Sequence, residues 1–327
     1  MTLSIVTTLY RSAPYLQEFY ARTCAIAERL THNFEIIFVN DGSPDDSLAV
    51  ALDIYRRDQR VRVVDLSRNF GHHKAMMCGL RQAGGDLVFL VDSDLEEEPE
   101  LLGPFYEELT AKRADVVYGV QQRRKGHLFE RLSGALFFKV FNLLSTHQIP
   151  ANHLTARLMT RRYVVSLCQH EEREFVISGL WALTGYTQIP MTVTKHHKRA
   201  SAYGLRRKIA LLVDAVTSFS AKPLVLIFYT GCILVTVSGL AALDLIIRRL
   251  FFGVLLEGWA SLIVSIWLLG GITIFWLGVI GIYLSKIFAE VKQRPYAIIK
   301  AIHGPDRSSA SSSAAGPGSG AYAASEI

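Results

Sequence analysis

The stretch Val88–Glu100, VFLVDSDLEEEPE, decides the fold and points to the chemistry. It begins with four apolar residues, which are typical of a buried strand, and six of the nine residues from Asp92 to Glu100 are carboxylates. A strand that is apolar throughout is buried on both faces, as in a parallel sheet covered by helices. The sequence therefore predicts a core strand that ends in a cluster of acids.

The same pattern of short apolar runs separated by helical segments extends over the first 121 residues. Short β-branched runs that alternate with helices of ten or more residues require crossover connections, and these are typical of a mostly parallel sheet. The predicted class is therefore α/β. The expected strands are residues 3–9, 34–41, 61–67, 86–94 and 115–121, and the expected helices are 15–30, 47–58, 74–83 and 99–112.

Acidic residues close three of the predicted strands, at Asp41, Asp65 and the pair Asp92 and Asp94. In open α/β sheets, ligands bind outside the carboxyl ends of the strands, so we expect these acids to converge on one edge. Asp41 has a second interpretation, as a cap of the helix that follows it. The acids at 97, 98 and 100 are expected to form a solvated first turn of a helix, where negative charge is favourable.

Asp92 and Asp94 are spaced so that both carboxylates can approach one hard cation such as Mg²⁺ or Mn²⁺. The motif D-x-D alone is weak, and an acid and base pair of a hydrolase is the alternative. Its position at the carboxyl end of a core strand favours a metal site, and a ligand that carries a nucleotide would bind there.

The adjacent His72 and His73 point apart and have no third ligand at suitable spacing, so no zinc site is predicted.

Two later segments are predicted to span a membrane as a hairpin. Leu224–Ile247 contains Asp244 as its only charge, Trp259–Leu284 contains none, and each is longer than the hydrocarbon thickness of about 30 Å. Basic residues before the first span and after the second favour both ends in the cytoplasm. The alternative is a pair of buried core helices.

The charge distribution, the cysteines and one further apolar segment bear on nucleic-acid binding, disulfide or metal sites, and membrane contact. The net charge of +6 is concentrated near the apolar segments, where it suits lipid headgroups and phosphates, so no nucleic-acid partner is expected. The four cysteines have no metal-ligand spacing and are expected to be reduced. Residues 128–147 are apolar on nearly every side, which fits either a buried helix or a helix in the membrane interface.

Several blocks together are similar to glycosyltransferase family 2, specifically its membrane-anchored polyprenyl-phosphate glycosyltransferases. They are SIVTTLYRSAPYL, FVNDGSPDDSL, DLSRNFGHHKAMMCGL, GGDLVFLVDSDLEEEPELL and EVKQRPYAI, in order over about residues 3 to 300. The resemblance implies a GT-A type fold, a nucleotide-sugar donor, inversion at the anomeric carbon, and Mg²⁺ or Mn²⁺. It also implies a polyprenyl (undecaprenyl) phosphate acceptor, a bacterial inner membrane location with a cytoplasmic catalytic domain, and a homo-oligomer, by analogy a tetramer.

On this resemblance the chain divides into five parts. A cytosolic catalytic domain occupies 1–205, a juxtamembrane amphipathic segment 206–222, and the two membrane helices 223–286. A cytosolic segment follows at 287–302, and the Ser-, Ala- and Gly-rich tail at 303–327 is expected to be disordered.

The resemblance also assigns roles to individual residues. The metal ligands are Asp92, Asp94 and Glu96, and the residues that carry catalysis are Asp92, Asp94, Arg131 and Arg157, with Arg131 and Ser133 in the stretch that meets the acceptor phosphate. The donor is contacted by Thr8, Tyr10, Asp41, Arg68, Lys198, Arg199 and Ser201, of which the last three lie, with Tyr203, in a loop that closes over the diphosphate.

Three departures from the family pattern bear on function. Ser12 and Thr155 stand where relatives carry acids, and the loop at Arg199–Ser201 is shortened. A phosphate acceptor is already a nucleophile near pH 7, so we expect Thr155 to be compatible with activity. The alternatives are transfer to a lipid-linked saccharide in O-antigen or cell-envelope assembly, and a catalytically silent membrane scaffold.

Overall fold

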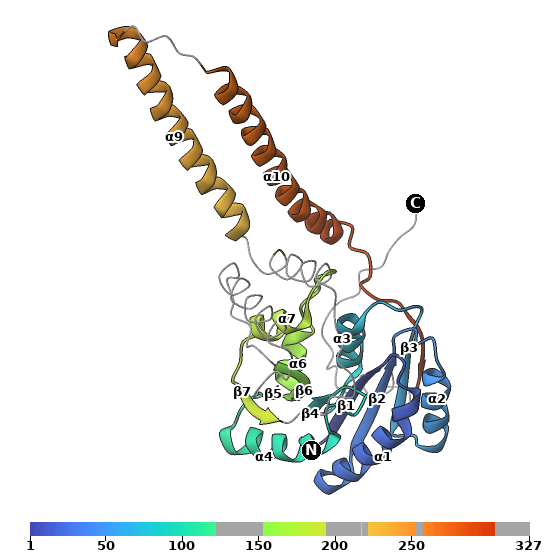
Figure 1. Cartoon of the computed structure of the whole chain (residues 1–327). Coiled ribbons are helices and arrows are strands. Elements are labelled where there is room, and N and C mark those ends of the chain that lie inside the picture. The colour runs from blue at the N-terminus through green and yellow to red at the C-terminus, as the bar shows by residue number, and fades with distance from the viewer. Residues whose placement is uncertain (122–152, 194–216, 218–221, 253–257, 305–327) are drawn as a thin grey trace, which may run out of the picture.

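The computed structural model describes residues 1–121, 153–193, 217, 222–252 and 258–304, and Figure 1 shows how they are arranged. The strands are β1 Leu3–Leu9, β2 Phe34–Asn40, β3 Val61–Leu66, β4 Leu87–Leu90, β5 Val116–Gln121, β6 His153–Thr160, β7 Gln188–Val193 and β8 Ile299–His303. The helices are α1 Ala13–Leu30, α2 Ser47–Arg57, α3 His72–Gln82, the 3-10 turn η1 Pro99–Leu101, α4 Leu102–Lys112, α6 Arg161–Leu167, α7 Ile177–Leu183, α9 Lys222–Phe252 and α10 Trp259–Val291.

The strands form one sheet in the order β7-β5-β6-β4-β1-β2-β3-β8. The pairs β1–β2, β1–β4, β2–β3 and β5–β7 are parallel. The strand β6 runs antiparallel to both β4 and β5, and β8 runs antiparallel to β3. The expected mostly parallel α/β sheet with flanking helices is confirmed, and the strands β6, β7 and β8 are additions that the sequence patterns did not predict.

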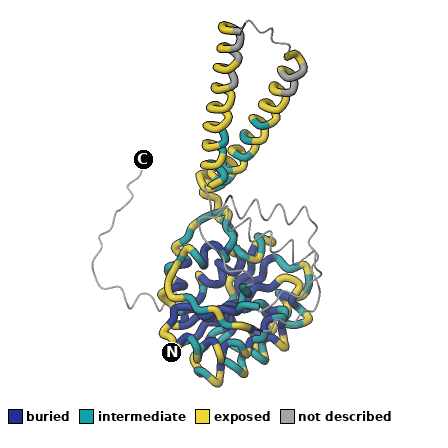
Figure 2. Tube along the Cα trace, turned by 60° about the vertical axis from the view of Figure 1, so that its left-hand side comes forward, coloured by how far each residue is buried: buried dark blue, intermediate teal, exposed yellow. Residues whose placement is uncertain are grey.

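Helices cover both faces of this sheet because side chains alternate along each strand. On one face, Ile5 of β1 packs in a cluster with Phe19 of α1 and Phe105 of α4. On the other face, Val6 packs in a cluster with Met77 of α3 and residues of α6 and α7. The buried residues therefore lie in the domain that contains the sheet, as Figure 2 shows.

The helices α9 and α10 project from this domain as a hairpin (Figure 1). The segments Lys222–Leu240 and Ser265–Val291 are long and apolar enough to cross a membrane, and the most apolar stretch of each has no buried residue. The alternative of two buried core helices is therefore wrong. At about 1.5 Å per residue, the 33 residues of α10 extend well beyond a hydrocarbon layer of about 30 Å. The helix continues past the expected end at Leu284 to Val291.

After α10 the chain returns to the domain. Ser67 N donates to Ile298 O at 2.9 Å, and β8 then pairs with β3, so the chain that leaves the hairpin completes one edge of the sheet. Residues 128–147, most of the segment 206–222, and the tail from 305 lie outside the described residues.

Candidate active site at the carboxyl end of the sheet

The loop that follows β4 is fixed by its middle residue, Ser93. Its hydroxyl is buried, donates to Thr8 O at 2.9 Å and lies 2.8 Å from Ser12 Oγ. The same Ser12 Oγ accepts from Tyr10 N at 3.1 Å. Ser12 therefore joins the loops after β1 and β4.

Asp94 and the residue after it give this loop a defined shape. Asp94 Oδ1 accepts from Glu96 N at 2.9 Å. Between them, Leu95 is buried and has a φ of 61°. A left-handed conformation costs a residue with a side chain on the order of 1–3 kcal/mol, and burial of the leucine offsets this cost. The carboxylate of Asp94 is thereby held at the carboxyl end of the sheet.

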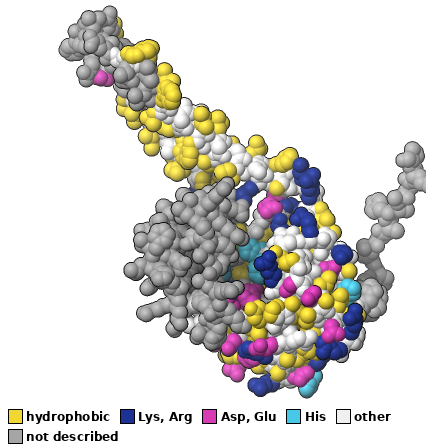
Figure 3. Space-filling view, turned by 45° about the vertical axis from the view of Figure 1, so that its right-hand side comes forward, with side chains coloured by type: hydrophobic (Ala, Val, Ile, Leu, Met, Phe, Trp, Pro, Cys, Tyr) yellow, Lys and Arg dark blue, Asp and Glu magenta, His cyan; other side chains and the backbone are white. Residues whose placement is uncertain are grey.

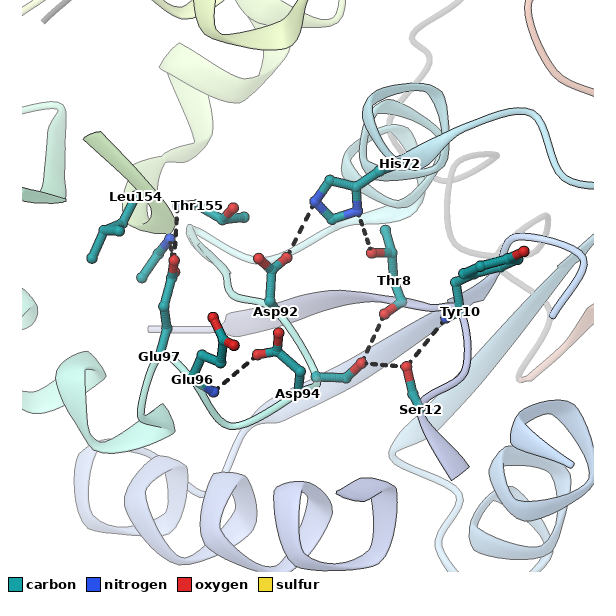
Figure 4. A network of polar contacts seen from close by, with 12 residues as sticks. Thr8, Tyr10, Ser12, His72, Asp92, Asp94, Glu96, Glu97, Leu154 and Thr155 are labelled. Atoms are coloured by element: carbon teal, nitrogen blue, oxygen red, sulfur yellow. Dashed lines mark hydrogen bonds and ion pairs between the residues drawn. The ribbon is translucent and has the colours of Figure 1, made fainter. Parts of the chain in front are cut away.

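His72 connects Asp92 to β1, which Figure 4 shows directly. Its Nε2 lies 3.4 Å from Asp92 Oδ1, and its Nδ1 lies 3.0 Å from Thr8 Oγ1. His72 is the first residue of α3, so the start of this helix is tied to the loop after β4, residues 91–98, which we call the acid loop. In the sequence, this histidine suggests at most a zinc ligand beside His73. The available signal was its place directly after Gly71, where the crossover from β3 enters the helix.

Asp41 lies in a buried position where β2 ends. Its two carboxylate oxygens accept from Phe70 N at 2.7 Å and Gly71 N at 3.1 Å. Burial raises the pKa of Asp41 above its ordinary value, and the two N–H donors act against that change. The interpretation of Asp41 as a cap of the following helix is wrong, because its partners belong to the loop before α3.

The turn after Asp41 requires a glycine. Gly42 has a φ of +58°, and a Cβ there would lie 2.4 Å from Asn69 N and 2.5 Å from the carbonyl carbon of Arg68. The turn after β2 thus lies directly against the loop before α3. The backbone of Arg68, one of the expected donor contacts, is held close to Asp41 by this contact.

Of the other residues expected at this edge, some have exposed side chains, and others are buried and hydrogen-bonded within the domain. Tyr10 is 49% exposed, and the Arg68 guanidinium lies 4.2 Å from the centre of the Phe70 ring. Asp65, in contrast, is buried, accepts from Asn40 Nδ2 at 2.7 Å and lies 3.4 Å from Lys300 Nζ. Asp65 therefore joins β2, β3 and β8.

Glu97 corrects one expectation. It is only 1% exposed, and its carboxylate accepts from Thr155 N at 3.3 Å and from Ala156 N at 2.6 Å. It is therefore not part of a solvated helix turn, since it fastens the acid loop to β6. Glu100 does lie at the surface, where it pairs with Arg22 at 2.7 Å.

Arg157, expected among the catalytic residues, is 2% exposed and packs over the Trp181 ring. Burial lowers its pKa to about 9, and the nearby charge of Glu97 acts in the opposite direction. Its guanidinium lies 3.4 Å from Thr155 O and 3.5 Å from Leu154 O. In this structure the buried Arg157 therefore supports the backbone of β6.

Asp92 and Asp94 suit a divalent cation that also binds phosphate. Mg²⁺ uses one or two carboxylates and completes its octahedron with water and substrate phosphates. Within the described ranges, no group of three or more His, Cys, Asp or Glu side chains is close enough to hold a metal. Glu96 is the expected third ligand, and its backbone N–H closes the turn of Asp94. The pair therefore offers two carboxylate ligands, and an ion held there would take its other ligands from water or a bound substrate.

The remaining expected contacts, at Arg131, Ser133, Lys198, Arg199, Ser201 and Tyr203, lie outside the described residues. Thr155 is placed by the structure on β6, across from Asp92 in Figure 4. The described part of the site therefore combines the expected residues Thr8, Tyr10, Asp41, Arg68, Asp92, Asp94 and Glu96 with the additional residues His72 and Glu97.

Comparison with known proteins supplies relatives over almost the whole chain. The sequence profile described as "Glycosyl transferase family 2" matches residues 4–167. A Mycobacterium tuberculosis protein described as "Putative glycosyltransferases" is 56% identical, covering 94% of this chain and 90% of its own length. The "Bactoprenol glucosyl transferase" of Shigella phage SfII is 30% identical, covering 93% and 99% respectively.

Among solved structures, one described as Staphylococcus aureus TarS 1-349 in complex with UDP-GlcNAc matches with a TM-score of 0.43 and 18% identity. The match covers 68% of this chain and 67% of that one. The sequence relatives are thus more similar and extend further along the chain than this structure does.

Proposed function

Because the chain belongs to glycosyltransferase family 2, we propose that it transfers a sugar from a nucleotide diphosphate sugar to a polyprenyl phosphate, with inversion at the anomeric carbon. The chain is a transferase by its family, and the proposal concerns the donor, the acceptor and the metal. The observation that carries it is the Asp92-Ser93-Asp94 loop, held at the carboxyl end of the sheet by Thr8, Ser12 and His72.

The donor fits this edge by charge and by shape. A departing nucleoside diphosphate gains negative charge, which Mg²⁺ or Mn²⁺ bound to Asp92 and Asp94 would neutralise. His72 and the backbone of Glu96 fix the two carboxylates before the donor binds. Asp41, Arg68 and Tyr10 surround the place proposed for the nucleoside.

The acceptor is proposed from two observations. Relatives at 30% identity are named bactoprenol glucosyl transferases, and the chain carries two helices apolar enough to cross a membrane. The acceptor phosphate needs no deprotonation, so the reaction requires no carboxylate base at Thr155. The hydroxyl of Thr155 is not required as a base in this reaction.

The membrane face is proposed from charge. Figure 3 shows Lys and Arg side chains gathered where the hairpin meets the domain, and Lys292 and Arg294 are exposed there. Such residues favour the cytoplasmic side and anionic lipid. We propose a bacterial inner membrane location with the catalytic domain in the cytoplasm, and a homo-oligomer, by analogy a tetramer.

The test is transfer of label from radioactive nucleotide sugars to membranes that contain undecaprenyl phosphate, in the presence of Mn²⁺. UDP-glucose, UDP-GlcNAc and GDP-mannose are offered in turn. Label in a lipid that mild acid cleaves supports the proposal, whereas label only in longer glycolipids supports transfer to a lipid-linked saccharide. No label from any donor in this panel contradicts the proposal.

Asp94→Asn is expected to abolish transfer while the protein is still produced and inserted. The substitution keeps the size of the side chain and removes the charge that a cation requires. Glu107→Gln, on the exposed side of α4, is the matched control and is expected to retain full transfer. Full turnover by Asp94→Asn would remove the metal assignment.

A further inference from the structure

The end of α10 is fastened to the domain by a carboxylate. Glu290, in the last turn of this helix, accepts from Arg173 N at 2.7 Å and from Glu174 N at 3.4 Å through one oxygen. The backbone between α6 and α7 is therefore held directly by the helix that leaves the proposed membrane. A hydrogen bond to a charged group is among the stronger ones available to a protein surface.

Six residues further along, Tyr296 makes a second attachment. Its ring meets Phe175 edge-on, with centroids 5.9 Å apart, and the Arg81 guanidinium lies 5.5 Å from the ring centre. Its hydroxyl interacts with the thiol of Cys78, and burial raises the pKa of both groups. Cys78 and Arg81 belong to α3, so the returning chain packs on that helix.

The helix α3 is also the one that holds the acid loop. Its first residue, His72, contacts Asp92 and Thr8, and two residues later Lys74 Nζ lies 2.9 Å from Glu174 Oε1. The end of α10, the loop at 173–175 and the helix α3 thus form a continuous set of contacts. This set runs from the hairpin to the candidate metal ligands.

We propose that Glu290 and Tyr296 are positioning residues that set α3, and with it the Asp92–Asp94 loop, at a fixed height and angle relative to the membrane. The inference rests on the proposed function, because it concerns an acceptor whose phosphate is confined to the bilayer surface. A phosphate confined in this way cannot adjust its height to a displaced site. The domain itself must therefore be held at the height at which the site meets the phosphate. A soluble phosphate can diffuse to the site in any orientation of the domain.

The test compares two acceptors with the full-length protein in lipid vesicles and Mn²⁺. One acceptor is undecaprenyl phosphate within the vesicle, and the other is geranyl phosphate supplied in solution. The donor is the radioactive nucleotide sugar that labels the wild-type product. The variants are Glu290→Ala and Tyr296→Ala, with Glu290→Gln and Tyr296→Phe as conservative versions, and Glu107→Ala as a control for the loss of a surface carboxylate.

The expected result is a split between acceptors. Transfer to undecaprenyl phosphate falls about tenfold or more in the two alanine variants, because small misplacements of reacting groups are costly. Transfer to geranyl phosphate stays within about twofold of the wild type, and the conservative variants recover part of the loss. The thermal unfolding temperature with UDP and Mn²⁺ reports whether each variant keeps a folded donor site.

Two results overturn the inference while the proposed function stands. One is an equal loss with both acceptors, which would show that Glu290 and Tyr296 only stabilise the domain. The other is an unchanged rate with undecaprenyl phosphate in every variant. Failure of the wild-type protein to label either acceptor with any donor would instead refute the proposed function, and the inference would fall with it.

Discussion

Removal of the Glu97 carboxylate tests whether the acid loop is fastened to β6 as the structure indicates. The side chain is buried and accepts from two backbone N–H groups, at 2.6 Å from Ala156 and 3.3 Å from Thr155. A hydrogen bond to a charged group contributes about 1.5–3 kcal/mol, and the longer of these two is expected to contribute less. Glu97→Ala should therefore lower the free energy of unfolding by about 3 kcal/mol.

Glu97→Gln gives an intermediate result for a specific reason. The amide keeps one oxygen as an acceptor, but its NH₂ group then faces the other backbone N–H. The expected loss is about 1–2 kcal/mol, since one buried donor is left without an acceptor. The loss is a substantial part of a typical total stability of about 5–15 kcal/mol.

The measurement is chemical denaturation of the full chain in detergent, followed by circular dichroism, with the slope against denaturant compared between variants. Glu107→Ala is the control, because this exposed residue of α4 has no such partners. An unfolding free energy of Glu97→Ala within about 0.5 kcal/mol of the wild type would refute the role given to this carboxylate.

Three further predictions concern other parts of the domain. His72→Ala should lower transfer, or the affinity for Mn²⁺, about 10- to 100-fold in a metal titration, as is typical when a group that orients a metal ligand is lost; unchanged titration would remove its orienting role. Thr155→Ala should change the rate of transfer less than about tenfold, because no general base is needed there, and a thousandfold loss would assign chemistry to its hydroxyl. Burial acts to raise the pKa of Asp58, but hydrogen bonds from Arg60 and Tyr20 lower it to about 2. Because the folded-state pKa is depressed, the carboxylate stabilises the fold above about pH 4, and this contribution, about 1–2 kcal/mol, is lost as the pH falls towards 2; the stability difference from Asp58→Asn should shrink over that interval.

The parts of the fold that depend on local pattern were predictable from the sequence. The strands β1 to β5 read as short apolar runs, and Asp41, Asp92 and Asp94 were expected where the structure places them, just beyond strand ends. The strands β6, β7 and β8 were missed. β6 has eight residues, but polar side chains interrupt its apolar pattern, and all three strands gain their partners from strands much earlier in the chain.

The candidate site shows the same division. Asp92 and Asp94 are visible in a motif, whereas the burial of Glu97 is not, because it lies within a run of carboxylates and its partners on β6 are about 58 residues away. His72 could not be paired with Asp92 from sequence spacing, since their proximity depends on the order of β1, β4 and the helix α3. The position of a residue at a strand end can be predicted from the local sequence. The partner of a buried polar group cannot, because it depends on how distant segments pack.

The strand β8 has a consequence for biosynthesis. The ribosome makes the other strands of the sheet before the hairpin, and Ile299–His303 emerges only after both apolar helices. Until then, β3 presents unpaired backbone groups at an open edge, which other chains could extend. The sheet is therefore completed only after translation of the hairpin, because β8 can pair with β3 only once both apolar helices have been synthesised.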